Sequence, residues 1–186
     1  NNIAVCFAIK RKKVLVIDGD LRHGSTSKYI GSPKHGLSDY LSGNITDFHE
    51  GIMQHPSHKN FFILPVGTVP PNPTELLYDH KFEQMIAAVR KEYDYVFIDC
   101  PPSDIVADTA IIEQHTDRTI FVVRSGLLEK SMLQQLEREF RAEKFKNMAL
   151  LLNGTESNTG RYRYKYGYKY GYRSYGYYGK DTYGNE

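Results

Sequence analysis

The sequence predicts an α/β fold in which helices cover both faces of a mostly parallel central sheet. Two features of the chain predict this fold. Short, continuous apolar runs recur along it, as is typical of strands buried on both sides, and amphipathic helical patterns alternate with them. Of its 186 residues 40% are hydrophobic and 25% charged, and residues 1–159 are expected to form one globular domain.

The expected strands are short runs of β-branched, leucine or aromatic residues bounded by polar or turn residues. They span residues 14–17, 61–64, 95–98, 119–123 and 148–152. Between them, apolar side chains at helical spacing predict two helices. The first presents one face made of Tyr78, Phe82, Met85, Ile86 and Val89, with Thr74 as a candidate cap, and the second presents Leu133, Leu136 and Phe140.

Polar residues follow the expected strands, and parallel sheets bind ligands at their carboxyl edge. We therefore expect one rim to gather Asp18, Asp20, Asp99, Arg124 and Asn153. A carboxylate at the end of a buried strand must be solvated, paired or bound to a cation. Magnesium suits this position, because it takes oxygen ligands and is commonly held by one or two carboxylates together with substrate phosphates.

The alternative is that strand-end aspartates cap the loops or helices that follow them. For Asp104 and Asp108 this alternative is the preferred interpretation. For Asp18, Asp20 and Asp99 the local sequence favours a magnesium site. Residues 14–22 read Val-Leu-Val-Ile-Asp-Gly-Asp-Leu-Arg, and residues 95–102 read Tyr-Val-Phe-Ile-Asp-Cys-Pro-Pro.

These two segments resemble the second acidic (Walker A′) and Walker B motifs of bacterial tyrosine kinases, P-loop relatives of the MinD and ParA ATPases. Residues 67–77, Gly-Thr-Val-Pro-Pro-Asn-Pro-Thr-Glu-Leu-Leu, resemble the family's Pro-Pro-Asn-Pro loop, which leads into a helix. The sequence departs from the family in lacking the Gly-rich loop that ends in Gly-Lys-Ser/Thr. Because residues 2–4 resemble the helix that follows this loop, we expect the sequence to begin a few residues after it.

The resemblance implies an ATP-dependent tyrosine kinase and roles for the residues at the rim. Asp20 and Asp99 would hold Mg²⁺, directly or through its waters. Asp18, the third acidic candidate at the metal, would accept the proton of the attacking tyrosine hydroxyl. Arg22 would steady the phosphates or a subunit contact.

Two further residues at the rim keep two interpretations each. Arg124 would reach the nucleotide or a phosphotyrosine, or would make a surface salt bridge. Asn153 occupies the place where MinD-like relatives use an asparagine on the adenine, and an amide can pair with the donor and acceptor edge of that base. The competing interpretation is a simple turn at Asn153-Gly154.

The last 27 residues differ in composition from the rest of the chain. Residues 160–186 contain ten tyrosines, six glycines and six basic residues, with no Leu, Ile, Val, Phe or Met, so they cannot bury a core and are expected to form a flexible tail. Residues 1–159 carry 18 basic and 20 acidic residues, a net charge of −2, whereas the tail carries 6 and 2, a net charge of +4. The predicted phosphate acceptors are Tyr162, Tyr164, Tyr166, Tyr168, Tyr170, Tyr172, Tyr175, Tyr177 and Tyr178.

The resemblance also implies partners and a location. The tail of one subunit would enter the active site of its neighbour within a ring-like homo-oligomer, and the added phosphate charge would act as an assembly switch. The kinase would work at the cytoplasmic face of the bacterial inner membrane, beside a membrane-spanning activator and opposed by a tyrosine phosphatase. It would regulate the synthesis and export of surface polysaccharide.

Two other functions stay open on the sequence alone. One is a MinD- or ParA-like ATPase that transfers phosphate to water, and the other is a non-catalytic scaffold with an aromatic, basic tail. Such a tail could also stack on single-stranded RNA or pair as an edge strand. Because neither use explains the aspartates upstream, no nucleic-acid partner is expected.

The remaining motifs favour plain structural roles. Cys6 and Cys100 lie in apolar stretches, which predicts small buried thiols in a reducing compartment. His55-Pro-Ser-His58 has no third ligand at a suitable spacing and predicts a solvated loop. The longest apolar run, residues 3–9, is far shorter than the roughly 18 residues that cross a bilayer.

Overall fold

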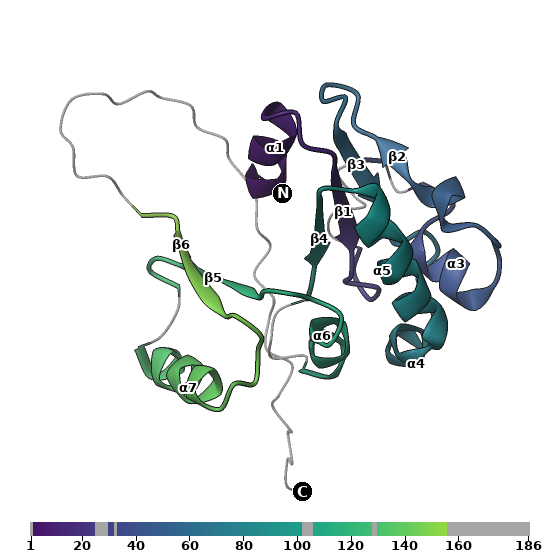
Figure 1. Ribbon diagram of the computed structural model, residues 1–186. Coiled ribbons are helices and arrows are strands. Elements are labelled where there is room, and N and C mark those ends of the chain that lie inside the picture. The colour runs from purple at the N-terminus through teal and green to yellow at the C-terminus, as the bar shows by residue number, and fades with distance from the viewer. Residues whose placement is uncertain (1, 25–29, 32, 102–105, 128–129, 156–186) are drawn as a thin grey trace, which may run out of the picture.

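The computed structural model describes residues 2–24, 30–31, 33–101, 106–127 and 130–155 (Figure 1). The predicted tail and its tyrosines, like Asp104, lie outside these residues. In the first part of the chain the elements are α1 (Asn2–Ile9), β1 (Val14–Asp18), α3 (Leu37–Ser42), the 3-10 helix η1 (Phe48–Gly51), β2 (Met53–Gln54) and β3 (Phe61–Leu64). The second part contains α4 (Pro73–Tyr78), α5 (His80–Glu92), β4 (Tyr95–Asp99), α6 (Val106–Glu113), β5 (Ile120–Arg124), α7 (Lys130–Arg141) and β6 (Ala149–Asn153).

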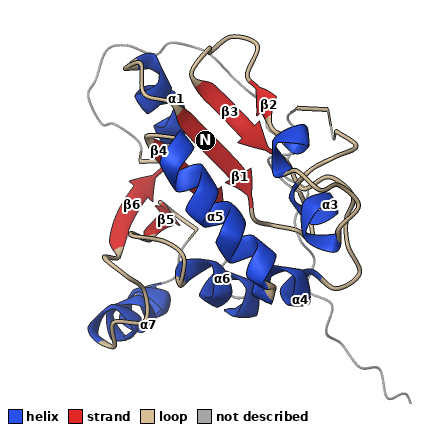
Figure 2. Cartoon of the chain, turned by 45° about the vertical axis from the view of Figure 1, so that its right-hand side comes forward, coloured by secondary structure: helices blue, strands red, loops and turns tan. Residues whose placement is uncertain are grey.

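The described strands form two sheets (Figure 2). Hydrogen bonds join four of them in the order β2-β3-β1-β4, with β1 parallel to both of its neighbours and β2 antiparallel to β3. Strands β5 and β6 form a separate parallel pair. The five strands expected from the sequence agree with β1, β3, β4, β5 and β6 to within one residue at each end, and the mostly parallel α/β arrangement is confirmed.

One part of the expected architecture is wrong. The sequence predicts a single sheet that contains all five strands, whereas the described strands form no ladder between β4 and β5. A continuous apolar run indicates that a strand is buried, but it does not indicate which strand lies beside it. The short antiparallel strand β2 was also missed, because two residues are too few to show a pattern.

Strand β1 supplies side chains to both faces of the larger sheet. Leu15 and Ile17 belong to a core cluster shared with α5, whereas Val14 and Val16 belong to a second cluster shared with α1. Successive side chains of a strand point to opposite faces, so the alternation of these four residues requires cover on both sides. Helices therefore cover both faces, as predicted.

The first predicted helix is two helices. Tyr78 ends α4 and is 79% exposed, so its predicted place on the buried face is wrong. The break occurs at Asp79, whose carboxylate accepts the Lys81 N–H at 2.8 Å and so caps α5. The other four residues of the predicted face are buried in α5: Phe82, Met85, Ile86 and Val89.

Helix α7 buries less than predicted. Of its three expected core residues only Leu136 is buried, while Leu133 and Phe140 are 44% and 58% exposed.

The predicted burial of Cys6 is also wrong, because its side chain is exposed on α1. His55 and His58 stack their rings with centroids 5.1 Å apart. Within the described part of the chain, no helix combines the length and the apolar composition needed to cross a bilayer.

A buried aspartate fixes the loop that leads into α4. The Asp39 carboxylate accepts the N–H groups of Gly36 and Thr68, each at 3.1 Å. A Cβ atom on Gly36 would lie 2.3 Å from the Pro65 carbonyl oxygen, so this close approach requires glycine. The Pro-Pro-Asn-Pro segment therefore starts from a rigid base, and α4 begins at its last proline, as expected.

We expect a pH-dependent contribution to stability from His49, which links η1 to the end of α5. Its Nε2 lies 3.0 Å from Glu92 Oε2 and its Nδ1 2.5 Å from Asp47 Oδ1. The hydrogen bond with Glu92, and next that with Asp47, raises the pKa of His49 above its ordinary value. The stabilisation is therefore fully present below the unfolded-state pKa of about 6.5 and is lost as pH rises through the higher folded-state pKa.

Urea unfolding of wild type and His49→Gln at about pH 5.5 and pH 8.5 checks this expectation. The wild-type advantage should be larger at the lower pH, although partial solvent exposure of the imidazole keeps it small. Glu92→Gln should remove most of the pH-dependent difference, since it removes the main cause of the shift. An equal advantage at both pH values would contradict the assignment.

Candidate functional site

Two predicted aspartates lie side by side where β1 and β4 end. In the parallel ladder Asp18 is paired with Asp99, and the Gly19 N–H donates to the Asp99 carbonyl at 2.8 Å. Neighbouring strands run about 4.8 Å apart, so the two residues share one end of the sheet. Each is the last residue of its strand rather than the first residue beyond it. We call Asp18, Asp20 and Asp99 the acid edge.

Gly19 allows the close approach of the two strand ends. A Cβ atom on Gly19 would lie 2.9 Å from Ile98 Cγ2 and 3.1 Å from both the Asp99 carbonyl oxygen and Ile112 Cδ1. Any larger residue would push the end of β1 away from β4. The glycine in Asp-Gly-Asp is therefore needed to keep the two aspartates adjacent.

Asp20 lies in the turn that follows β1 and is only 6% exposed. Its carboxylate accepts the His23 N–H at 3.1 Å, and its carbonyl accepts the Gly24 N–H at 2.8 Å. Its own N–H donates to Asp18 Oδ1 at 3.3 Å, so Asp18, which is fully buried, is tied to the same turn. Asp20 thus caps the turn, as the alternative interpretation proposed, and also lies at the acid edge.

Cys100 is a buried thiol that lies near both Asp99 and Asp20. Burial, together with the negative charges of Asp99 and Asp20, raises the pKa of Cys100 to about 12. The thiol therefore stays protonated at neutral pH and is unsuited to act as a nucleophile. The predicted structural role of Cys100 agrees with this position, while the two carboxylates give the site a negative potential.

Arg22 is held by an ion pair that the sequence did not predict. Its Nε donates to Asp108 Oδ2 at 2.9 Å, and its Nη2 donates to the Thr74 hydroxyl at 2.9 Å. Thr74 in turn donates to Asp108 Oδ1 at 2.5 Å, and the Asp108 carboxylate is buried. This triad joins the turn after β1 to the first turns of α4 and α6.

The triad corrects two predictions. Thr74 lies inside α4, which has Asn72 at its N-cap position, so it is not the cap. Asp108 was expected to cap a loop or helix, but it lies in the first turn of α6 and its carboxylate pairs with a guanidinium 86 residues earlier in the chain. Contacts over such a separation leave no local spacing signal. The contact between Asp20 and His23, by contrast, is local. Their three-residue spacing is typical of a turn and could have predicted it.

Arg124 and Asn153 lie opposite each other in the register of the second sheet, formed by β5 and β6. They are register partners at the ends of β5 and β6, so the prediction that all five polar residues share one sheet edge is not met. The Asn153 side-chain oxygen accepts the Gly154 N–H at 2.8 Å, and Gly154 has a φ of +72°. This is the turn that the competing interpretation proposed, and contact with an adenine stays a prediction.

The donor set at the acid edge fits an ion that is held largely by phosphates. Over the described ranges, no three His, Cys, Asp or Glu side chains form a metal-binding group. Magnesium is commonly bound through one or two carboxylates, several waters and substrate phosphates, and adjacent carboxylates suit that chemistry. Magnesium binding by Asp18, Asp20 and Asp99 therefore stays a prediction.

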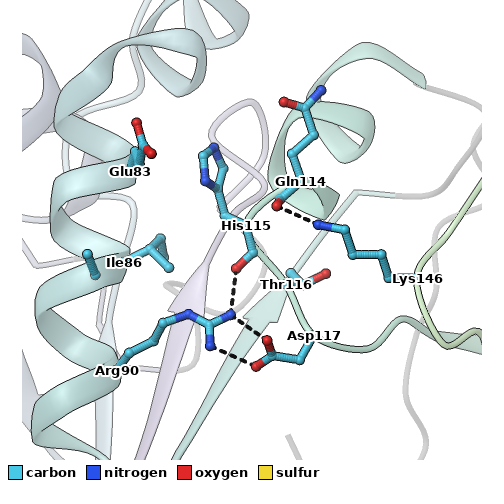
Figure 3. A pocket seen from close by; sticks show the side chains of 9 residues that line it. Glu83, Ile86, Arg90, Gln114, His115, Thr116, Asp117 and Lys146 are labelled. Atoms are coloured by element: carbon cyan, nitrogen blue, oxygen red, sulfur yellow. Dashed lines mark hydrogen bonds and ion pairs between the residues drawn. The ribbon is translucent and has the colours of Figure 1, made fainter.

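A separate cavity of about 250 Å³ lies between α5 and the segment that leads into β5 (Figure 3). Arg90 forms a bidentate pair with Asp117, with N–O distances of 2.8 and 2.9 Å, and also donates to the His115 carbonyl. Lys146 donates to the Gln114 carbonyl at 2.7 Å. Since both cations of the cavity are engaged in these contacts, they act as structural links between the segments that line it.

Comparison with known proteins finds relatives that match most of the chain. A family model described as an AAA domain matches residues 1–146. The chain is 36% identical over 163 residues to the tyrosine-protein kinase CpsD of Streptococcus pneumoniae serotype 4, covering 87% of this chain and 71% of that protein. It is 32% identical over 182 residues to CpsD of Streptococcus agalactiae, covering 96% of this chain and 74% of that protein.

The solved structures that this chain resembles include a tyrosine kinase domain and a MinD protein. The kinase domain of the Escherichia coli tyrosine kinase ETK matches with a TM-score of 0.73 and 33% identity, over 91% of this chain and 64% of that chain. MinD of Pyrococcus horikoshii matches with a TM-score of 0.63 at 23% identity, over 81% of this chain and 61% of that chain, which shows the fold alone. The chain belongs to the family of bacterial tyrosine-protein kinases and has their MinD-like P-loop NTPase fold.

Proposed function

We propose that the protein is an ATP-dependent tyrosine autokinase that transfers the γ-phosphate of ATP to tyrosines in the tail of a neighbouring subunit. One observation carries the proposal: β1 and β4 end in adjacent aspartates, with a third acid two residues further on. Family membership supports a tyrosine kinase in particular, because CpsD and ETK are named as such.

The proposed roles follow from the needs of phosphoryl transfer. When bound with ATP, Mg²⁺ neutralises charge on the phosphates, and Asp20 and Asp99 are the residues that would hold it. Asp18 would accept the proton of the tyrosine hydroxyl, whose ordinary pKa of about 10 keeps it neutral before attack. Arg22, anchored by Asp108, would support the turn that presents Asp20. Arg124 and Asn153 are the remaining candidates for nucleotide contact.

The tail is the proposed acceptor. Its tyrosines alternate with Arg, Lys or Gly from Tyr162 to Tyr172 and lack the aliphatic neighbours that would bury them. Each phosphate adds about −1.5 to −2 charges, so three would cancel the +4 of the tail. We propose transfer between subunits of a ring, beside a membrane-spanning activator at the cytoplasmic face of the bacterial inner membrane. In this setting phosphorylation would regulate surface polysaccharide synthesis and export, and a tyrosine phosphatase would reverse it.

Incubation of the full-length protein with MgATP, followed by phosphate mapping by mass spectrometry, tests the proposal. We expect phosphate on several of the nine predicted tail tyrosines. Tyr78, which is 79% exposed on α4, serves as an internal control and should stay unmodified. A variant with the nine tyrosines replaced by phenylalanine should lose the signal.

The other outcomes identify the other functions. Release of free phosphate without tail modification would indicate a MinD-like ATPase. The absence of any ATP-dependent change in the full-length protein would indicate a non-catalytic scaffold. Either result would contradict the autokinase proposal.

A further inference from the structure

We propose that His23 is a positioning residue that holds the Asp20 carboxylate in the orientation that binds magnesium together with nucleotide. The inference rests on the proposed function of the acid edge and adds a residue to it. Resemblance to the family assigned no role to His23, which follows directly after the Asp-x-Asp-x-Arg segment.

The contact involves both oxygens of the carboxylate. His23 Nδ1 lies 3.1 Å from Asp20 Oδ1 and 3.2 Å from Oδ2, and the backbone N–H of His23 donates to Oδ1 at 3.1 Å. Because a carboxylate only accepts hydrogen bonds, Nδ1 must carry the hydrogen, which fixes the tautomer of a neutral ring. The imidazole is 44% exposed and the carboxylate 8% exposed, so the ring lies on the solvent side of the pair.

This arrangement leaves Asp20 able to bind a cation. Two carboxylate oxygens offer about four lone-pair positions, and the contacts with His23 do not occupy all of them. A hydrogen bond from a neighbouring side chain restricts the rotation of the carboxylate and so fixes where the remaining lone pairs point. Loss of such a partner next to a metal ligand typically lowers metal affinity about 10–100-fold.

The turn that contains His23 is held independently of its imidazole. The Gly24 N–H donates to the Asp20 carbonyl at 2.8 Å, and the Arg22 guanidinium is anchored to Asp108 and Thr74. Removal of the ring should therefore take the side-chain donor from the Asp20 carboxylate, which keeps only the backbone N–H of His23, while leaving the backbone of the turn in place. This separation makes the proposal testable by substitution.

The test measures Mn²⁺ binding to the full-length protein with ADP by electron paramagnetic resonance, using Mn²⁺ in place of Mg²⁺. His23→Phe keeps a ring but removes the side-chain donor Nδ1. We expect the dissociation constant of this variant for Mn²⁺ to rise about 10-fold. His23→Asn should restore binding, because its amide nitrogen is attached to Cγ as Nδ1 is. The matched control is His80→Phe, which removes another histidine–carboxylate pair of the same i,i+3 spacing, with Nδ1 2.9 Å from Glu83 Oε2.

Kinetics give a second measurement that a purely structural role would not reproduce. In His23→Phe the Mg²⁺ concentration for half-maximal tail phosphorylation should rise, while kcat at saturating Mg²⁺ stays close to wild type. Unchanged or tighter Mn²⁺ binding in His23→Phe, with normal binding by wild type, would overturn the inference and leave the kinase proposal intact. Failure of wild type to bind Mn²⁺ with ADP would overturn both.

Discussion

Replacement of Asp18 with asparagine is expected to lower the rate of tail phosphorylation roughly 10²–10⁴-fold, the usual contribution of a general base. Asparagine has nearly the same shape, and its side-chain oxygen can still accept the Asp20 N–H that Asp18 accepts at 3.3 Å. It cannot take up the proton of the tyrosine hydroxyl. Single-turnover phosphorylation at saturating MgATP, with the modified tyrosines counted by mass spectrometry, measures the loss.

Asp94→Asn is the matched control for this prediction. Asp94 precedes β4 at the opposite end of the sheet, where its carboxylate accepts the Lys13 N–H at 2.7 Å and is 44% exposed. Its replacement should leave the rate near that of wild type. Full activity of Asp18→Asn would remove Asp18 from the proposed mechanism, and the base would then have to be sought at Asp20 or Asp99.

Replacement of Phe82 with alanine is expected to destabilise the domain by about 3–5 kcal/mol. Phe82 is completely buried in α5 and contacts His115 edge-on, with ring centroids 5.5 Å apart. Its loss leaves a cavity in the cluster that also contains Leu15 and Ile17 of β1. Because β1 positions Asp18, we expect activity to fall near the lowered melting temperature.

Phe140→Ala is the control, since it makes the same chemical change at a residue that is 58% exposed on α7. Its cost should stay within about 0.5 kcal/mol, as for other surface substitutions. Urea denaturation of both variants beside wild type measures the difference. Equal destabilisation by the two substitutions would show that α7 is packed more tightly than its exposure indicates.

The parts of the fold that depend on local patterns could be predicted from the sequence. Strands such as Val14–Asp18 show as apolar runs, and the buried face of α5 shows as helical spacing from Phe82 to Val89. The adjacency of Asp18 and Asp99 could also be expected, because parallel strands end at the same edge. In each case the signal lies within a few residues of the element that it predicts.

The parts that depend on distant contacts could not be predicted. The ion pair of Arg22 with Asp108 joins residues 86 positions apart, and neither residue has a local pattern that requires the other. The separation of the β5–β6 pair from the larger sheet depends on which strand edges meet, which apolar composition does not encode. Tyr78 was misplaced because a helical pattern can continue across a break, here the cap at Asp79.

The buried carboxylate of Asp108 has a mechanical consequence. Because Arg22, Thr74 and Asp108 belong to three different segments, the turn after β1 cannot shift without straining the starts of α4 and α6. Breaking such a contact would leave a charge uncompensated inside the protein, so the three segments should move together. A displacement of the turn that carries Asp20 would then reach the starts of both helices through a single buried carboxylate.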